Sequence, residues 1–254
     1  MPQLTLIALQ RFPEVQPGDS LSSLILKCLE TDGLHLADGD VVVLAQKVVS
    51  KSEDRFRWLD EVEPSPRARE LAAKAQKDAR LVELVLLESR EVLRCHNGVI
   101  VVEDVRGFVL ANAGIDASNV PDSKGRQRVL LLPSNPDESA ARIRRELESA
   151  SHMTLGVVIN DSWGRAWRTG TIGTAVGISG IPGLMDLRGV PDRHGRALQT
   201  TEVGIGDELA AAASLLMGQA AEGRPVVLVR GFPYPSYNGT VRELLRPVGM
   251  DMFR

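Results

Sequence analysis

The chain has 254 residues, of which 43% are hydrophobic and 25% are charged, and it carries a formal net charge of −3. These values are typical of a globular protein that buries its core without disulfides, and the charge gives no sequence-wide basic field of the kind that binds nucleic acid. No apolar run is long enough to span a membrane and no signal peptide follows Met1, so we expect a cytoplasmic protein with no nucleic-acid or membrane partner.

The first part of the chain alternates strand and helix patterns. Residues 4–9 (LTLIAL) are predicted to form a strand, and apolar side chains recur at helical spacing over 21–29. The β-branched run 41–50 (VVVLAQKVVS) is predicted as a buried strand, and the lysines Lys47 and Lys51 lie at its end.

The middle and last parts of the chain mix short strands with helices. Ser65-Pro66 has the cap-then-proline order of a helix start, so one or two helices are predicted over 66–89. The further predicted strands cover residues 92–94, 99–102, 108–110, 130–132, 155–159 and 226–229. The further predicted helices cover residues 135–147 and 206–217, with Gly218 as the cap of the second. Hairpin-like strand pairs beside helices favour an α+β fold with mixed or antiparallel sheets and packed helices.

Two stretches share one layout, in which a strand is followed by an aspartate among small and polar residues. Asp116 lies in ANAGIDASNV (111–120), and Asp161 lies in VVINDSWGR (157–165). Both aspartates are predicted at strand ends, where carboxylates together with substrate phosphates hold Mg²⁺ or Mn²⁺. The same pattern is also typical of turns in which an aspartate accepts hydrogen bonds from its own backbone. From the residues alone, both interpretations stay open.

Cationic residues form a second group of candidates. Five arginines crowd into two glycine-containing stretches, at positions 165, 168, 188, 193 and 196. Their planar guanidinium groups suit a polyanionic substrate, and a solvated loop with local Asp–Arg pairs is the alternative. Lys47 and Lys51 could bind phosphate as point charges or simply be solvated. Met217-Gly218-Gln219 could present backbone amides to a ligand or form an ordinary helix C-cap. The sequence contains neither a P-loop nor a zinc-ligand spacing.

Taken together, these motifs resemble a known family. In this order, the chain carries the stretches QKVVSK, ANAGIDASNV, LLPSNPDESA, VVINDSWGRAWRTG, GISGIPGLMDLRG, DRHGRALQTT, DELAAAASLLMGQA and PVVLVRG. They resemble the gamma-glutamyl ligases of the deazaflavin coenzyme F420, and the match covers about residues 4–231. The resemblance implies a single gamma-glutamyl ligase domain over 1–254 without the fused flavin-reductase-like domain of some members. It also implies an α+β fold and an intertwined homodimer.

The resemblance implies a role for each motif. The implied metal ligands are Asp116, Asp161, Ser162 and Gln219, the last at a place where other members carry glutamate. The implied nucleotide-binding residues are Phe12, Pro13, Glu14, Val15, Gln46, Lys47, Lys51, Asn119, Met217, Gly218, Gln219, Ala220, Ala221 and Glu222. Asp116, Asp161 and Lys51 are the expected catalytic residues. Arg165, Arg168, Arg188 and Arg196 are the expected substrate-binding residues.

The family adds L-glutamate to the terminal carboxylate of coenzyme F420-0 and then adds γ-linked glutamates, with GTP and a divalent cation. The implied partners are therefore F420-0, L-glutamate and GTP, and the implied ions are Mg²⁺ or Mn²⁺ with K⁺ as a further candidate. An acyl phosphate is the expected intermediate. The alternatives are a ligase of the same chemistry on another carboxylate acceptor, and a non-catalytic protein that binds a nucleotide or a deazaflavin.

Overall fold

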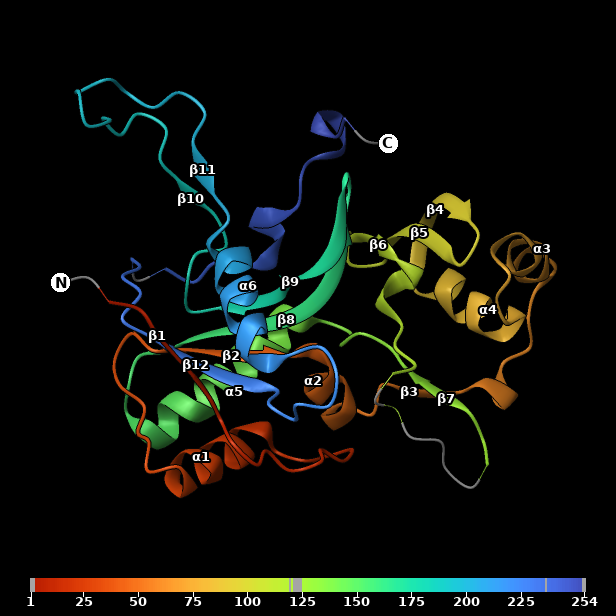
Figure 1. Ribbon diagram of the computed structural model, residues 1–254, viewed down its shortest axis with the longest axis horizontal. Coiled ribbons are helices and arrows are strands. Elements are labelled where there is room, and N and C mark those ends of the chain that lie inside the picture. Colours follow the sequence, from red (N-terminus) through yellow and green to blue (C-terminus); the bar gives the residue numbers. More distant parts are fainter. Residues whose placement is uncertain (1–2, 119, 121–124, 236, 253–254) are drawn as a thin grey trace.

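The computed structural model of the chain describes residues 3–118, 120, 125–235 and 237–252. Its centre is a five-stranded mixed sheet with the strand order β1-β12-β2-β8-β9 (Figure 1). The strands are β1 (Thr5–Ala8), β2 (Val41–Ala45), β8 (Gly156–Arg165), β9 (Arg168–Ser179) and β12 (Val226–Arg230). The described residues therefore form an α+β fold with a mixed central sheet, as the sequence predicts.

Strand directions place several chain segments at one edge of this sheet. β2 and β8 pair in parallel, from Val41 opposite Gly156 to Ala45 opposite Asn160. β12 runs antiparallel to β2, and β1 runs antiparallel to β12. As a result, β1 and β2 end and β12 begins at the same edge, which we call the carboxyl edge.

Helices cover both faces of the sheet (Figure 1). α6 (Ile205–Met217) packs on one face, while α5 (Pro136–Ser151) and α1 (Leu21–Thr31) lie on the other. Ala210 and Ala213 of α6 are fully buried, and such small side chains let the helix approach the strands closely. The covered strands β2 and β12 are apolar on both faces, as expected for strands between two helical layers.

A lobe inserted between β2 and β8 lies beside the sheet (Figure 1). The lobe contains two helices, α3 (Pro66–Ala75) and α4 (Ala79–Leu87). A three-stranded sheet is formed by β4 (Ser89–His96), β5 (Val99–Asp104) and β6 (Val109–Ala111). A two-stranded ribbon pairs β3 (Phe56–Trp58) with β7 (Arg128–Leu130). The lobe has a small core of its own, which includes Ala68, Val82, Val85, Ile100 and Val102.

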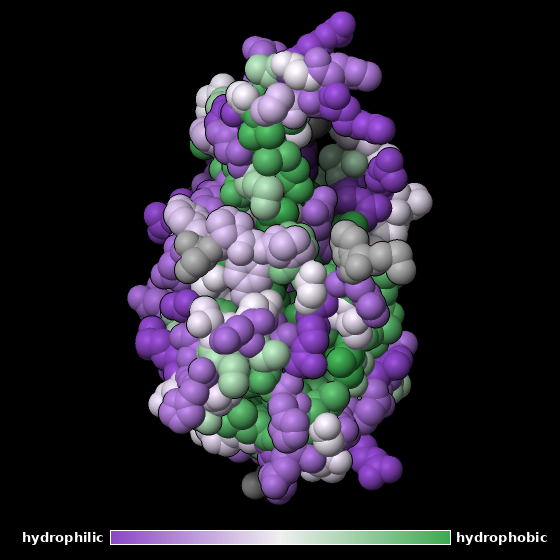
Figure 2. Space-filling model, turned by 90° about the vertical axis from the view of Figure 1, so that its left-hand side faces the viewer, coloured by the Kyte–Doolittle hydropathy of each residue, from purple (hydrophilic) through white to green (hydrophobic). Residues whose placement is uncertain are grey.

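An arm projects from the other side of the molecule. It consists of β10 (Met185–Asp186), β11 (Glu202–Val203) and the loop between them. Figure 1 shows this arm extending away from the sheet. Figure 2 shows the same side of the molecule, with hydrophobic surface in the narrow upper part of the molecule.

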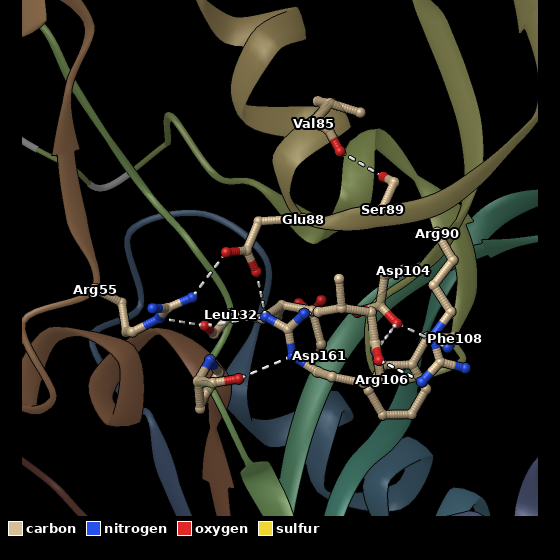
Figure 3. Close-up of polar contacts among 12 residues, drawn as sticks. Arg55, Val85, Glu88, Ser89, Arg90, Asp104, Arg106, Phe108, Leu132 and Asp161 are labelled. Carbon is tan, nitrogen blue, oxygen red and sulfur yellow. Dashed lines mark hydrogen bonds and ion pairs between the residues drawn. The ribbon is translucent and has the colours of Figure 1, made fainter. Parts of the chain in front are cut away.

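A buried ionic cluster fastens the lobe to the rest of the chain (Figure 3). Arg106 pairs with Asp104 at 2.9 Å and with Glu88 at 2.7 Å, and Glu88 also pairs with Arg55 at 3.1 Å. The guanidinium groups of Arg55 and Arg106 also donate to the carbonyl oxygens of Leu132 and Pro133. Burial raises the pKa of the Asp104 carboxyl group, and the charge of Arg106 opposes this rise. We call these four charged residues the lobe clamp.

Most predicted elements are confirmed, with three corrections. The predicted strand 130–132 lies too far along the chain, since β7 covers Arg128–Leu130. The predicted strand 41–50 is wrong in its second half, because α2 (Gln46–Ser52) begins directly after β2. Val48 and Val49 are buried within this helix, so packing overrides their preference for strands. The predicted strand 155–159 is too short, since β8 continues to Arg165 against β9. Within the described residues, no helix combines the length and apolar character needed to cross a membrane.

Removing Arg106 tests the lobe clamp. Arg106→Ala leaves the carboxylate of Asp104, which is fully buried, without its partner. We expect the free energy of unfolding in urea to fall by about 3–5 kcal/mol, the cost of an unpaired buried charge. Arg69→Ala, which removes an exposed pair with Glu63, is the matched control and should cost far less. Equal losses for the two variants would contradict a stabilising role of the clamp.

Candidate functional site

The carboxyl edge holds a cavity of about 680 Å³. The cavity is lined by four segments of the chain at this edge. They are the chain after β1, the start of α2, the middle of β8 and the loop before β12. The lining residues include Phe12, Pro13, Glu14, Val15, Gln46, Lys47, Lys51, Asn160, Asp161, Ser162, Met217, Gly218, Gln219, Ala220, Ala221 and Glu222. The structure thus brings together all the predicted nucleotide-binding residues except Asn119, which lies outside the described residues.

Asp116 is carried by the lobe and contacts Gln46 and Lys47 of the cavity wall. Its backbone forms a two-way bridge with Leu130, and Gly114 just before it has a φ of +67°. A Cβ at Gly114 would lie 2.7 Å from Leu132, so glycine lets this turn approach the neighbouring segment closely. The prediction that Asp116 stands at a strand end is wrong, since β6 ends at Ala111 and Asp116 follows a turn. This turn directs the carboxylate toward Gln46 and Lys47 of α2.

The start of α2 holds the Asp116 carboxylate. Gln46 Nε2 donates to Asp116 Oδ2 at 2.6 Å, and Lys47 Nζ lies 2.9 Å from the same oxygen. Ser50 donates to Gln46 Oε1, which orients the amide so that its nitrogen faces Asp116. Burial raises the pKa of Asp116, while Lys47 and Gln46 oppose the rise.

Asp161 lies inside β8, one residue beyond the last pair with β2. The prediction that it stands at a strand end is therefore wrong, since it pairs with Thr174 of β9. Its Oδ1 accepts from Ser162 N and its Oδ2 accepts from Trp163 Nε1, both at 2.8 Å. Burial and the nearby negative charge of Asp116 raise the pKa of Asp161 to about 6, and these two hydrogen bonds oppose the rise.

Lys51 and the loop after α6 complete the cavity wall. Lys51 is 7% exposed, and its Nζ lies 2.5 Å from Glu14 Oε1. In the loop, the carboxylate of Glu222 accepts from Ala220 N at 2.8 Å and folds back over Gly218. Gly218 has a φ of +75° and, as predicted, caps α6. Backbone amides that hold a carboxylate in this way present the donors that a phosphate oxygen also needs.

The residues of the site could hold a divalent cation only if a bound substrate also supplied ligands, such as phosphate oxygens. Among the residues that the structure describes, no group of three or more His, Cys, Asp or Glu side chains could hold a metal ion. Two aspartates, however, repel each other across the site, and such a pair gains from a cation between them. Mg²⁺ and Mn²⁺ suit this arrangement, because they commonly bind one or two carboxylates plus substrate phosphates. Ser162 and Gln219 on the cavity wall could add neutral oxygen ligands.

The predicted substrate-binding arginines do not line the cavity. Arg165 and Arg168 lie at the tip of the β8–β9 hairpin, while Arg188 and Arg196 lie on the arm. Arg188 pairs with Asp186, as the local-pair alternative predicts. Their contact with a substrate stays a prediction.

Sequence reasoning missed two residues beside the aspartates. Trp163 donates to Asp161, and Asn160 is buried with its Nδ2 3.4 Å from Met217 Sδ. Trp163 follows Asp161 by two residues within NDSWGR, and this spacing on a strand places both side chains on one face. The predicted strand stops before Asp161, so the sequence pattern alone does not place these two side chains on one strand face.

The fold and the cavity define an α+β ligand-binding protein in which two aspartates and two lysines converge at one edge of a mixed sheet. A family model described as F420-0:gamma-glutamyl ligase matches residues 10–231 of the chain. The chain belongs to this family.

Similar proteins carry one name, coenzyme F420:L-glutamate ligase. The protein of Methanothermobacter thermautotrophicus is 45% identical over 253 residues, which are 99% of each chain. That of Methanococcus maripaludis strain C7 is 48% identical over 219 residues, or 86% of each chain. That of Archaeoglobus fulgidus is 40% identical over 242 residues, which cover 95% of this chain and 93% of the relative.

The charge repulsion within the site predicts a titration. In protein without added metal, NMR of the labelled side-chain carboxyl group should give Asp161 a pKa of about 6, above the ordinary value near 4. Asp116→Asn removes the neighbouring negative charge and should lower this pKa. Since a bound cation requires the carboxylate form, binding of Mn²⁺ should weaken as pH falls through about 6. An Asp161 pKa that does not respond to Asp116→Asn would contradict the coupling.

Proposed function

We propose that the protein is a ligase that joins L-glutamate to the terminal carboxylate of coenzyme F420-0 and then adds further glutamates through γ-linkages. Membership of the family and the names of the relatives support the substrate class. The observation in the molecule that carries the proposal is the convergence of Asp116, Asp161, Lys47 and Lys51 beside one cavity.

The reaction needs an activated acceptor, because the oxygen of a free carboxylate is a poor leaving group. In our proposal, GTP transfers its γ-phosphoryl group to the carboxylate of F420-0, which gives an acyl phosphate and GDP. The amine of L-glutamate then attacks the acyl carbon, and inorganic phosphate leaves as the amide bond forms. The amine loses a proton to a general base or to solvent in this step.

Phosphoryl transfer depends mainly on positioning and on neutralising charge. Lys47 and Lys51 supply two positive charges at the cavity, where each now pairs with a carboxylate. The loop 217–222 supplies backbone amides, one of which already binds the carboxylate of Glu222. The cavity volume of about 680 Å³ lies in the range of small-molecule sites. These features support a nucleoside triphosphate as the bound ligand, and the family resemblance implies that it is GTP.

Asp116 and Asp161 would hold Mg²⁺ or Mn²⁺, with Ser162 and Gln219 as further ligands. The bound cation would neutralise negative charge on the phosphates of the nucleotide. K⁺ stays a further candidate ion.

Two alternative functions would use the same residues. A ligase acting on another carboxylate acceptor would use an identical nucleotide site, and assays with alternative acceptors separate the two. A non-catalytic nucleotide- or deazaflavin-binding protein would bind GTP without releasing GDP.

The intertwined homodimer is also part of the proposal, and sedimentation velocity tests it.

Replacing one aspartate tests the proposed chemistry. Purified protein is incubated with F420-0, GTP, Mn²⁺ and L-glutamate, and the products are identified by mass spectrometry. We expect wild-type protein to add glutamyl units and to release GDP. Asp116→Asn should lower GDP release by roughly a hundredfold or more, the scale of losing one electrostatic contact to the transition state.

The control is Asp60→Asn, which alters an exposed aspartate paired with Arg126 and should leave turnover unchanged. Circular dichroism checks that both variants remain folded. Undiminished turnover of Asp116→Asn would remove this residue from the site. A wild-type protein that neither adds glutamate nor releases GDP would refute the proposed function.

A further inference from the structure

We propose that Trp163 is a positioning residue for the metal-binding carboxylate of Asp161. The inference rests on the proposed function, in that it takes Asp161 to be a ligand of the divalent cation. Nothing in the sequence motifs assigned Trp163 a role.

The indole and the carboxylate are placed by the strand that carries both. Asp161 and Trp163 lie two residues apart in β8, so their side chains leave the same face. The indole N–H donates to Asp161 Oδ2 at 2.8 Å, while the backbone N–H of Ser162 donates to Oδ1. Each carboxylate oxygen keeps a further lone pair for a cation. The two donors therefore fix the plane of the carboxylate without blocking it.

The indole is held in turn by the lobe. Phe108, which is 1% exposed, meets the Trp163 ring edge to face, with the ring centroids 5.3 Å apart and the planes at 65°. The backbone N–H of Phe108 donates to Asp104 of the lobe clamp at 2.9 Å. Figure 3 shows Phe108, the clamp and Asp161 in one region of the molecule.

This chain of contacts links the two aspartates of the site. Asp116 is carried by the lobe, and Asp161 is carried by the central sheet. Because Phe108 belongs to the lobe and packs on Trp163, the same lobe that positions Asp116 also restrains the donor to Asp161. A cation that needs both carboxylates depends on their relative placement, which this contact sets. Outer hydrogen-bond partners of metal ligands commonly contribute tenfold to a hundredfold in metal affinity.

Trp163→Phe tests the inference, because it keeps an aromatic ring for Phe108 while it removes the N–H donor together with the pyrrole part of the indole. Binding of Mn²⁺ to the intact protein in the presence of GDP is followed by the EPR signal of free Mn²⁺. We expect the Kd for Mn²⁺ to rise about tenfold to a hundredfold, with the thermal unfolding midpoint close to that of wild type. Trp167→Phe is the matched control, because Trp167 is 87% exposed at the hairpin tip, and its Kd should not change.

A double variant separates positioning from general packing. If Trp163 acts through Asp161, Trp163→Phe should weaken Mn²⁺ binding in the wild-type background and have no further effect in the Asp161→Asn background. An equal effect in both backgrounds, or an unchanged Kd for Trp163→Phe alone, would overturn the inference while leaving the ligase proposal intact. If wild-type protein with GDP binds no Mn²⁺, the proposed metal site itself fails.

A measurement on the wild-type protein covers the case in which Trp163→Phe does not fold. In protein labelled with ¹⁵N-tryptophan, addition of Mg²⁺ in the presence of GDP should shift the indole N–H resonance of Trp163 more than that of Trp58. Trp58 serves as the reference because it stacks under Arg126 on the β3–β7 ribbon of the lobe. A Trp163 resonance that does not respond to Mg²⁺ would also overturn the inference.

Discussion

The parallel pairing of β2 with β8 is the constraint on which the site depends. It places the end of β2 beside the middle of β8, so that Gln46 and Lys47 follow Ala45 directly next to Asp161. The antiparallel strands β12 and β1 then bring the loop after α6 and the chain after β1 to the same edge. If β8 ran in the opposite direction, Asp161 would lie at the far edge of the sheet, away from both lysines. Strand direction therefore gathers residues from the whole length of the chain around one cavity.

The site also requires that two like charges be held near each other. Burial and the negative charge of Asp116 together raise the pKa of Asp161, so the two carboxylates disfavour each other's ionised form in the metal-free protein. Lys47 offsets part of this repulsion, and the lobe clamp together with the Phe108–Trp163 contact keeps the lobe against the sheet. Unfavourable electrostatics of this kind are typical of functional sites, since a bound cation relieves them. A protein without a cation to bind would gain stability from replacing one of the two aspartates.

Much of the architecture could be predicted from the sequence, because its helices and strands carry clear local signals. Ser65 caps its helix as its position before Pro66 indicates, and the apolar run at 226–229 forms a buried strand. The helix over 46–52 could not be predicted, since its valines favour strands and only packing makes them helical. The family motifs indicated the cavity residues, but the role of Trp163 depends on the length of β8 and on a contact with the lobe. Such contacts between distant segments leave no periodic pattern in the sequence.

We propose that one divalent cation is shared by an aspartate of the lobe and an aspartate of the sheet. Anomalous scattering from Mn²⁺ in crystals grown with GDP tests this most directly. We expect a peak within about 2.0–2.3 Å of carboxylate oxygens from both Asp116 and Asp161, as for a bound ion of this type. A peak that contacts neither aspartate, or a full cavity with GDP and no Mn²⁺ peak, would contradict it.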